Sequence, residues 1–236
     1  MIKGILFDLD GTLMDHRAAA DAGIAAWIED WIAARAPGLP LPERAATVWA
    51  ELEEVHLSAW HAGECDLPEQ RRRRIRGICQ ALGLAVPEDL DAAFAAFTRH
   101  YRAGWSPYPD VHEALARLGG YRLGVLTNGS SPVQIAKMRA IGLGELGPVL
   151  SGDVLGGHFK PAPASYLAAA DRLGLEPGAI LLVGDDLVND VTGPAAAGMR
   201  SLWLDRLGVE TAPEGFARIA TLSELPGYLS GHSDLG

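Results

Sequence analysis

Two apolar segments of the sequence each end in a group of aspartates, an arrangement that suits metal-dependent chemistry. Asp8 and Asp10 follow the segment ILF, and three further acids, Asp185, Asp186 and Asp190, follow ILLVG. Side chains two positions apart in a strand point to the same side, so the first two carboxylates repel each other unless a cation lies near them. Carboxylates gathered at neighbouring strand ends favour a hard cation with oxygen ligands, and Mg²⁺ is the one we expect.

Neutral and cationic side chains elsewhere in the chain extend this chemistry. Thr127 and Asn128 follow a third apolar run, RLGVL, and offer a hydroxyl and an amide to anionic oxygens. Lys160, one of three lysines in the chain, lies in the segment HFKPAP. A carboxylate accompanied by a metal, an ammonium group and a hydroxyl is suited to phosphoryl transfer, in which positioning and charge neutralisation do most of the catalysis.

The segments that carry these residues predict the parallel strands of an α/β sheet. The strong runs cover residues 3–10, 121–129 and 179–186, and weaker ones cover 147–153 and 200–205. Helical patterns lie between them, at residues 110–119, 131–142, 162–174 and 189–198. Strands that alternate with helices indicate a Rossmann-like parallel sheet flanked by helices, and such sheets bind ligands outside the carboxyl ends of their strands. Polar residues end each of the three strong runs, so we expect the site there.

Residues 16–106 show no strand pattern and predict an inserted all-helical domain. The expected helices cover residues 17–35, 43–62, 68–83 and 87–104. Five of the six tryptophans lie in this insertion, and we interpret them as its core, with one or two lining a substrate pocket. The α/β core domain then consists of residues 1–15 and 107–236.

Composition limits the classes of function. The chain has 236 residues, of which 48% are hydrophobic, enough for a sizeable core. A formal net charge of −10 disfavours nucleic acid and anionic membrane as partners. Two cysteines without CxxC spacing fit a reduced compartment. The first residues lack the long apolar run of a secretory signal, and no run of about 18 apolar residues occurs, so we expect a cytoplasmic protein without a membrane span.

Four motifs in order resemble those of the haloacid dehalogenase superfamily of hydrolases. They are FDLDGTL at residues 7–13, LTNG at 126–129, KPAPASY at 160–166 and LLVGDDLVNDVTGPAAAGM at 181–199. The insertion between the first two motifs is similar to the helical cap of that family. The resemblance implies a Mg²⁺-dependent phosphatase that acts on a small phosphorylated metabolite through an aspartyl-phosphate.

The resemblance also implies roles for individual residues. Asp8 would be the nucleophile, and Asp10 would protonate the leaving oxygen and then take a proton from the attacking water. Thr127 would bind phosphoryl oxygens, and Lys160 would neutralise charge between nucleophile and phosphate.

The metal and the substrate would be held by a further set of residues. Mg²⁺ would be held by Asp8, the backbone carbonyl of Asp10 and Asp185, with Asp190 as a supporting ligand or an acid behind the ligands. Asp186 would either orient a metal-bound water or face solvent. The candidates for substrate contacts are Asn128, Gly129, Gly11 and His16; Gly11 also permits a tight backbone turn.

Several alternatives stay open within and beyond the family. A sugar-phosphate mutase would share every core residue. Dehalogenases of the family need no metal and lack the second aspartate of the first motif, so Asp10 favours a phosphatase. A phosphonate hydrolase is excluded, because it would need a cap lysine and residues 16–106 contain none. A non-catalytic binding module is the alternative from another class. The run Arg71–Arg76 is interpreted as a solvated helix face, with contact to a substrate anion as the second interpretation.

Overall fold

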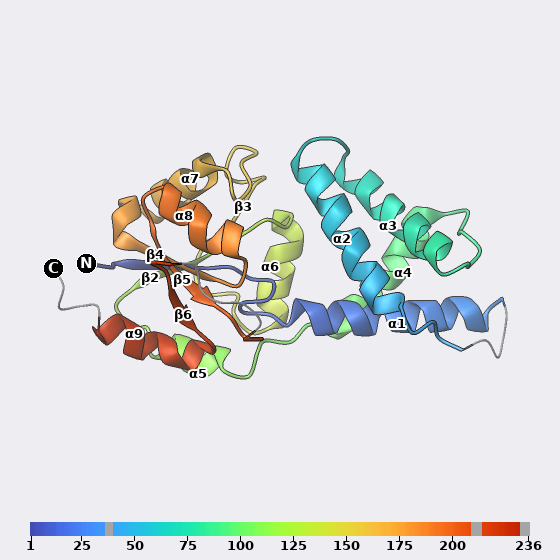
Figure 1. Ribbon diagram of the computed structural model, residues 1–236, viewed down its shortest axis with the longest axis horizontal. Helices are drawn as coiled ribbons and strands as arrows, with labels where there is room; N and C mark the ends of the chain where they lie inside the picture. The colour runs from blue at the N-terminus through green and yellow to red at the C-terminus, as the bar shows by residue number, and fades with distance from the viewer. Residues whose placement is uncertain (36–39, 209–213, 232–236) are drawn as a thin grey trace. The chain divides into compact units, whose positions relative to one another are not determined.

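The computed structural model describes residues 1–35, 40–208 and 214–231. The chain divides into two compact units (Figure 1). The core unit consists of Met1–Asp15 and Ser106–Gly236, and the helical unit of His16–Trp105. The helical unit is thus an insertion between the first and second strands of the core unit.

The core unit is built on a parallel sheet of six strands in the order β3-β2-β1-β4-β5-β6. The strands are β1 (Gly4–Phe7), β2 (Arg122–Thr127), β3 (Val149–Ser151), β4 (Ile180–Gly184), β5 (Arg200–Leu204) and β6 (Ala217–Ile219). The predicted α/β class with a Rossmann-like parallel sheet is confirmed. β1 lies between β2 and β4, and every residue of β1 is buried, as expected for a central parallel strand covered on both faces.

Helices cover both faces of this sheet. They are α5 (Val111–Ala116), α6 (Ser131–Ala140), α7 (Pro163–Leu173), α8 (Gly193–Ala196) and α9 (Leu225–Gly231). Figure 1 shows α7 and α8 on one side of the sheet and α5 and α9 on the other. Leu6, Leu126 and Leu182 point to the side of α7 and pack with its Tyr166 in one buried cluster. Alternate residues of each strand therefore serve the two layers.

Three features of the core unit differ from the sequence expectations. The helix expected at 189–198 begins as a π-helical turn, Leu187–Thr192, and only then becomes the short α8. Neither β6 nor α9 was expected. β6 has three residues, too few for a periodic pattern, and it forms by pairing with β5.

The helical unit contains α1 (His16–Ala33), α2 (Ala45–His61), α3 (Leu67–Ala81) and α4 (Leu90–Ala103). Two aspartates define helix starts: Asp66 accepts a hydrogen bond from the Glu69 N–H at 2.7 Å, and Asp89 accepts one from the Ala92 N–H at 2.9 Å. The indole of Trp49 is fully buried and packs against the ring of Phe97, with 4.4 Å between centroids. These aromatic contacts form the core of the unit.

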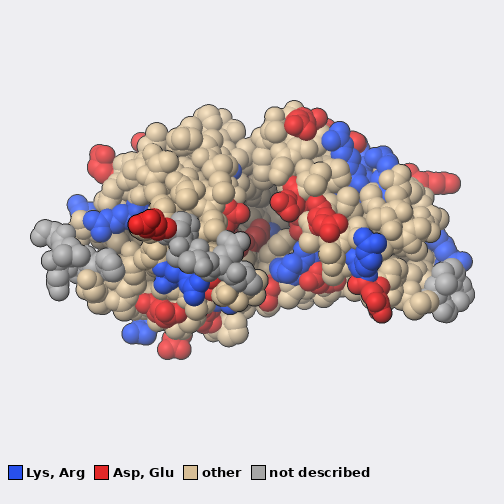
Figure 2. All heavy atoms as spheres, viewed as in Figure 1, with Lys and Arg blue, Asp and Glu red and all other residues tan. Residues whose placement is uncertain are grey.

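The visible surface carries both signs of charge. Figure 2 shows acidic and basic side chains interspersed over each unit, and on this face the described residues form no continuous basic stripe. Among the described residues, no helix combines the length and the apolar character needed to cross a bilayer.

Candidate functional site

The carboxyl ends of the three central strands bring together side chains that are far apart in the sequence. The register pairs Phe7 with Val125 of β2 and with Val183 of β4. The Asp8 N–H donates to the Val183 carbonyl at 2.9 Å and continues this pairing one residue beyond β1. Asp8, the end of β2 and the start of the loop after β4 therefore meet at one edge of the sheet.

Three carboxylates lie close enough at this edge to share a cation. One oxygen each from Asp8, Asp185 and Asp190 lies within 4.8 Å of the others. Asp8 and Asp190 are buried, whereas Asp185 is exposed. A set made only of carboxylate oxygens fits a hard divalent cation such as Mg²⁺ better than a soft one. The side chain of Asp10 does not belong to this set.

The ammonium group of Lys160 lies between two of these carboxylates. Its Nζ donates to Asp8 Oδ1 at 2.7 Å and to Asp190 Oδ1 at 2.6 Å, and the whole side chain is buried. Burial alone lowers the pKa of this ammonium, but the Asp190 and Asp8 carboxylates outweigh it and hold the pKa above its ordinary value. Burial raises the pKa values of Asp8 and Asp190, and Lys160 offsets part of each rise.

Asn128 holds the backbone of the loop that carries Lys160. Its Nδ2 donates to the Lys160 carbonyl at 2.8 Å, and its Oδ1 accepts from the Lys160 N–H at 2.8 Å. This pair of hydrogen bonds ties the loop to the end of β2. The sequence pattern predicts a substrate contact for Asn128, whereas the contact present in the structure is with the backbone of Lys160.

The turn after Asp10 depends on Gly11. Gly11 has a φ of 97°, in the region that favours glycine, and a Cβ there would lie 2.3 Å from Asp185 Oδ2. The expected tight turn is therefore present, and it also makes room for a carboxylate of the cluster. Thr12, to which the sequence analysis gave no role, donates from Oγ1 to Asp185 Oδ1 at 2.8 Å.

Asp10 is held by two residues of α6. Lys137 Nζ lies 2.7 Å from each Asp10 carboxylate oxygen, and Gln134 Nε2 donates to Asp10 Oδ2 at 3.0 Å. The same Gln134 amide donates to Thr127 Oγ1 at 2.6 Å. A network of side chains thus links the second aspartate of the first motif to the threonine of the second.

Gly129 provides the space for this network. A Cβ at Gly129 would lie 2.5 Å from Cδ and 2.6 Å from Nε2 of Gln134, so the Gln134 amide would have to move from its present position. The second motif predicts a substrate contact for Gly129. Within the core unit its absent side chain is what lets the Gln134 amide reach Thr127.

The two remaining acids of the fourth motif differ in their contacts. Asp190 is buried and accepts from the Asp186 N–H at 3.1 Å as well as from Lys160. Asp186 is exposed, and its Oδ1 accepts from the Val188 and Asn189 N–H groups at 2.9 and 2.7 Å. Asp186 therefore caps the π-helical turn, a role that neither sequence interpretation included.

His16 belongs to the helical unit, where it is part of a polar network. Its Nδ1 lies 2.7 Å from the Tyr101 hydroxyl, and its Nε2 lies 2.9 Å from Glu53 Oε2. Glu53 Oε1 also pairs with Arg74 Nη2 at 2.7 Å. The guanidinium of Arg74 lies 4.2 Å from the centroid of the Trp49 ring, and Arg74 is 4% exposed. The interpretation of Arg71–Arg76 as a solvated face is therefore wrong for Arg74, because ion pairing and an aromatic face compensate for its burial.

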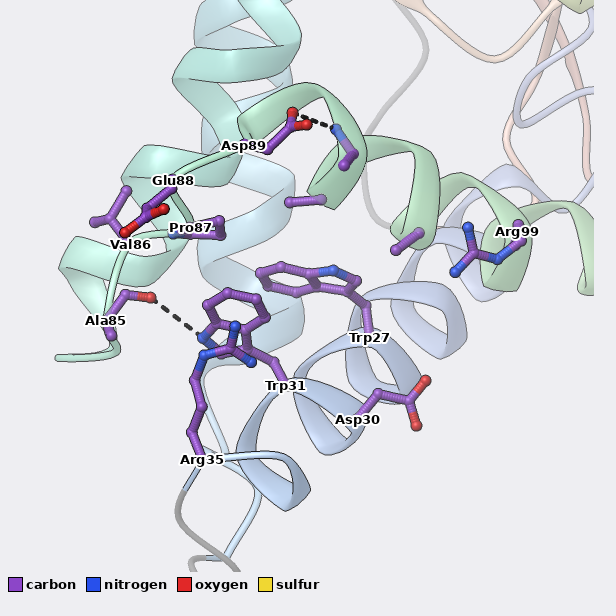
Figure 3. A pocket seen from close by; sticks show the side chains of 13 residues that line it. Trp27, Asp30, Trp31, Arg35, Ala85, Val86, Pro87, Glu88, Asp89 and Arg99 are labelled. Carbon is purple, nitrogen blue, oxygen red and sulfur yellow. Dashed lines mark hydrogen bonds between the residues drawn. The ribbon is translucent and has the colours of Figure 1, made fainter.

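A groove of about 590 Å³ lies within the helical unit, between α1 and the start of α4 (Figure 3). The rings of Trp27 and Trp31 stack along it, with 5.7 Å between centroids and 15° between planes. Trp31 Nε1 donates to the Ala85 carbonyl at 3.2 Å, and the Arg35 guanidinium lies 3.1 Å from the centroid of the Trp31 ring. Two of the tryptophans thus line a groove, whereas Trp49 belongs to the core.

Several known proteins are similar to this chain in sequence. The model of the haloacid dehalogenase-like hydrolases matches residues 2–198 of the chain. The glyceraldehyde 3-phosphate phosphatase of Methanopyrus kandleri is 32% identical over 212 residues, which cover 87% of this chain and 85% of that protein. The (S)-2-haloacid dehalogenase of Xanthobacter autotrophicus is 31% identical, over 79% of this chain and 68% of that protein.

A solved structure has the same fold over nearly the whole chain. The hydrolase YfnB of Bacillus subtilis, in a crystal form bound to magnesium, aligns with a TM-score of 0.79 at 21% identity, over 97% of this chain and 98% of that one. At this level of identity the likeness concerns the fold, including the inserted helices, and not the reaction.

Proposed function

Because the chain belongs to the haloacid dehalogenase-like hydrolases, we propose that it is a Mg²⁺-dependent phosphatase that hydrolyses the phosphate monoester of a small metabolite through an aspartyl-phosphate. One observation carries the proposal. A buried carboxylate, Asp8, contacts a buried ammonium group, shares an edge of the sheet with two further carboxylates, and is followed two residues later by a second, separately held acid. Each part has a task in phosphoryl transfer.

Asp8 is the proposed nucleophile. One of its oxygens attacks phosphorus as the bond between phosphorus and the ester oxygen breaks, which leaves a phosphoryl group on Asp8. Lys160 reaches Asp8 at 2.7 Å and offsets the negative charge that nucleophile and phosphate bring together. Thr127, buried at the end of β2, would donate its hydroxyl to a phosphoryl oxygen.

Asp10 is proposed to handle the protons. It gives a proton to the ester oxygen as the alcohol leaves, and it takes one back from the water that attacks the phosphoryl group on Asp8. That second step releases inorganic phosphate and restores both aspartates. Asp10 therefore gives one proton and receives one proton in each turnover. One residue, Leu9, separates this acid from the nucleophile in the sequence.

Asp8, Asp185 and the backbone carbonyl of Asp10 would hold Mg²⁺, with Asp190 behind them. When bound, the metal supplies positive charge that permits a phosphate dianion to approach the acidic edge. Thr12 holds the Asp185 carboxylate, and Trp203 Nε1 donates to the Asp185 carbonyl at 3.0 Å. The chain itself thus orients this ligand.

The same residues favour a dehalogenase less than they favour a phosphatase, although one relative is named for dehalogenase activity. A halide leaves as a stable anion and needs no proton, so a positioned acid such as Asp10 would have no task. Dehalogenases of this family also need no metal, so a cluster of three carboxylates would have no cation to hold. An alkyl phosphate, whose alkoxide must be protonated, uses both features.

The helical unit is proposed to act as a cap that selects the substrate. It is inserted directly after the loop that carries Asp8 and Asp10. Caps that close over a site exclude water and large substrates, so phosphorylated metabolites would be turned over and phosphoproteins would not.

The proposal is tested with a panel of phosphate esters. Glyceraldehyde 3-phosphate, glycerol 3-phosphate, hexose phosphates, phosphoserine and p-nitrophenyl phosphate are incubated with the protein and Mg²⁺, and phosphate release is measured. We expect turnover of at least one alkyl ester, its loss in excess chelator and its recovery on addition of Mg²⁺. Full activity in chelator refutes the metal assignment, and release of halide from 2-chloropropionate without any phosphatase activity refutes the reaction.

A further inference from the structure

Two buried side chains of the core unit donate hydrogen bonds to the Asp10 carboxylate. Lys137 is 4% exposed and Gln134 is fully buried, and both donate to the Asp10 carboxylate. Burying a lysine is costly unless its ammonium is paired, so the side chain at position 137 is not that of an ordinary surface lysine. Asp10 itself is only half-buried, with 27% of its side chain exposed.

Both side chains that donate to Asp10 lie on α6, and a hydrogen bond holds the start of this helix in place. Lys137 and Gln134 are three residues apart on α6 and therefore lie on one face of it. α6 starts directly after the loop that follows β2, and its first turn is anchored by Asp153, whose carboxylate accepts from the Ser131 N–H at 2.9 Å. The donors are thus carried by a regular element that begins at the same edge of the sheet as the site.

Gln134 joins the two parts of the site. Its amide donates both to Asp10 and to Thr127, and Gly129 leaves the space that it occupies. Thr127 is the proposed contact of the phosphoryl group, and Asp10 is the proposed acid for the leaving oxygen of the same group. A shift of α6 would therefore displace Thr127 and Asp10, the two proposed contacts of the substrate, at the same time.

We infer that Lys137, assisted by Gln134, is a positioning residue that holds the Asp10 carboxylate in register with Thr127, so that the acid reaches the leaving oxygen of a phosphate bound at Thr127. The inference rests on the proposed phosphatase function. Misplacing a reacting group by about 1 Å costs on the order of 10²-fold in rate.

The first experiment compares two kinds of leaving group in the full-length protein. Lys137→Met removes the ammonium but keeps the length of the side chain. We expect kcat/KM for the best alkyl ester of the panel to fall about 10- to 100-fold, and kcat/KM for p-nitrophenyl phosphate to fall less than about threefold, because an aryl oxide needs little protonation. The ratio kcat/KM is compared because it reports the step in which the alcohol leaves and not the later hydrolysis of the aspartyl-phosphate, which both esters share. Arg139→Met, at an exposed position of the same helix, is the matched control and should change neither rate.

A double-mutant cycle separates positioning from a merely structural role. If Lys137 acts through Asp10, Lys137→Met should cost almost nothing once Asp10 is replaced by Asn. The double variant also lacks the carboxylate that Lys137→Met alone leaves without its ammonium partner, so it provides the measurement even if the single variant folds poorly.

Each outcome decides the inference. Selective loss on the alkyl ester together with non-additivity in the cycle supports it. Equal losses on both esters, or a loss in the Asp10→Asn background as large as in the wild type, overturns it while leaving the phosphatase proposal intact. A wild-type protein that hydrolyses neither ester overturns the proposed function and this inference with it.

Discussion

Lys160→Met should destabilise the core unit because it removes the cation that contacts two buried carboxylates, Asp8 and Asp190. The substitution keeps a long apolar side chain, and Asn128 contacts only the backbone of residue 160, so the loop should stay anchored. What changes is the charge: Asp8 and Asp190 lose an ammonium at 2.7 and 2.6 Å.

The expected cost is large for a single substitution. Breaking a buried ion pair by removing one partner costs about 3–5 kcal/mol, and for a chain of this size that corresponds to a fall in Tm of roughly 6–20 °C. The loss should shrink as pH falls. Burial raises the pKa values of Asp8 and Asp190 already in the presence of Lys160, so without it these carboxyls should take up protons at a higher pH than exposed ones.

Thermal unfolding in excess chelator, followed by circular dichroism at pH 7.5 and pH 5, measures the effect. Lys3→Met serves as the control, because Lys3 is exposed at the opposite end of β1 and its replacement should change stability by less than about 0.5 kcal/mol. Adding Asp8→Asn to Lys160→Met should restore part of the lost stability, since it removes one of the unpaired charges.

The reasoning is refuted if Lys160→Met melts within about 2 °C of the wild type at pH 7.5. It is also refuted if the loss of Tm is the same at pH 5, or if Asp8→Asn makes the Lys160→Met protein still less stable.

Three further predictions concern other residues. Asp8→Asn should abolish phosphate release while the circular dichroism spectrum is unchanged, because Asn lacks the anionic oxygen that attacks phosphorus; retention of a substantial fraction of the rate would exclude Asp8 as nucleophile. Asp110 accepts from Arg206 at 3.0 and 3.1 Å, and although burial by itself raises the pKa of Asp110, its hydrogen bonds hold that pKa below the ordinary value. A carboxyl whose pKa is depressed in the folded protein stabilises the fold at pH values above its ordinary pKa near 4, and this stabilisation is lost as the pH falls through the pKa of the folded state. Asp110→Asn should therefore lower Tm at pH 7 and make progressively less difference to Tm below about pH 4. A Tm difference that is constant with pH would contradict this. Arg74→Met should destabilise the helical unit by roughly 3–5 kcal/mol, because it removes the buried guanidinium that pairs with Glu53, and a melting curve that matches the wild type would show that this pair contributes little.

Local patterns in the sequence were sufficient to predict the elements and the acidic part of the site. Apolar runs of buried parallel strands are continuous and easy to recognise, and each run ends where a polar residue first appears. Because parallel strands end at one edge of a sheet, Asp8 and Asp185 could be placed together although they lie 177 positions apart in the sequence (185 − 8). The same reasoning put Thr127 at that edge, and helical periodicity predicted the four helices of residues 16–106.

The tertiary structure decided which side chains pair across the fold. Lys137 contacts Asp10 across 127 positions, and Arg74 is buried against Trp49 and Glu53, yet neither position differs from an ordinary helical residue in local pattern. Spacing along the chain reports which face of an element a residue occupies, but not which distant side chain that face meets. Charged side chains are usually exposed, so the burial of these two cations became visible only once the packing of whole helices had placed their carboxylate partners beside them.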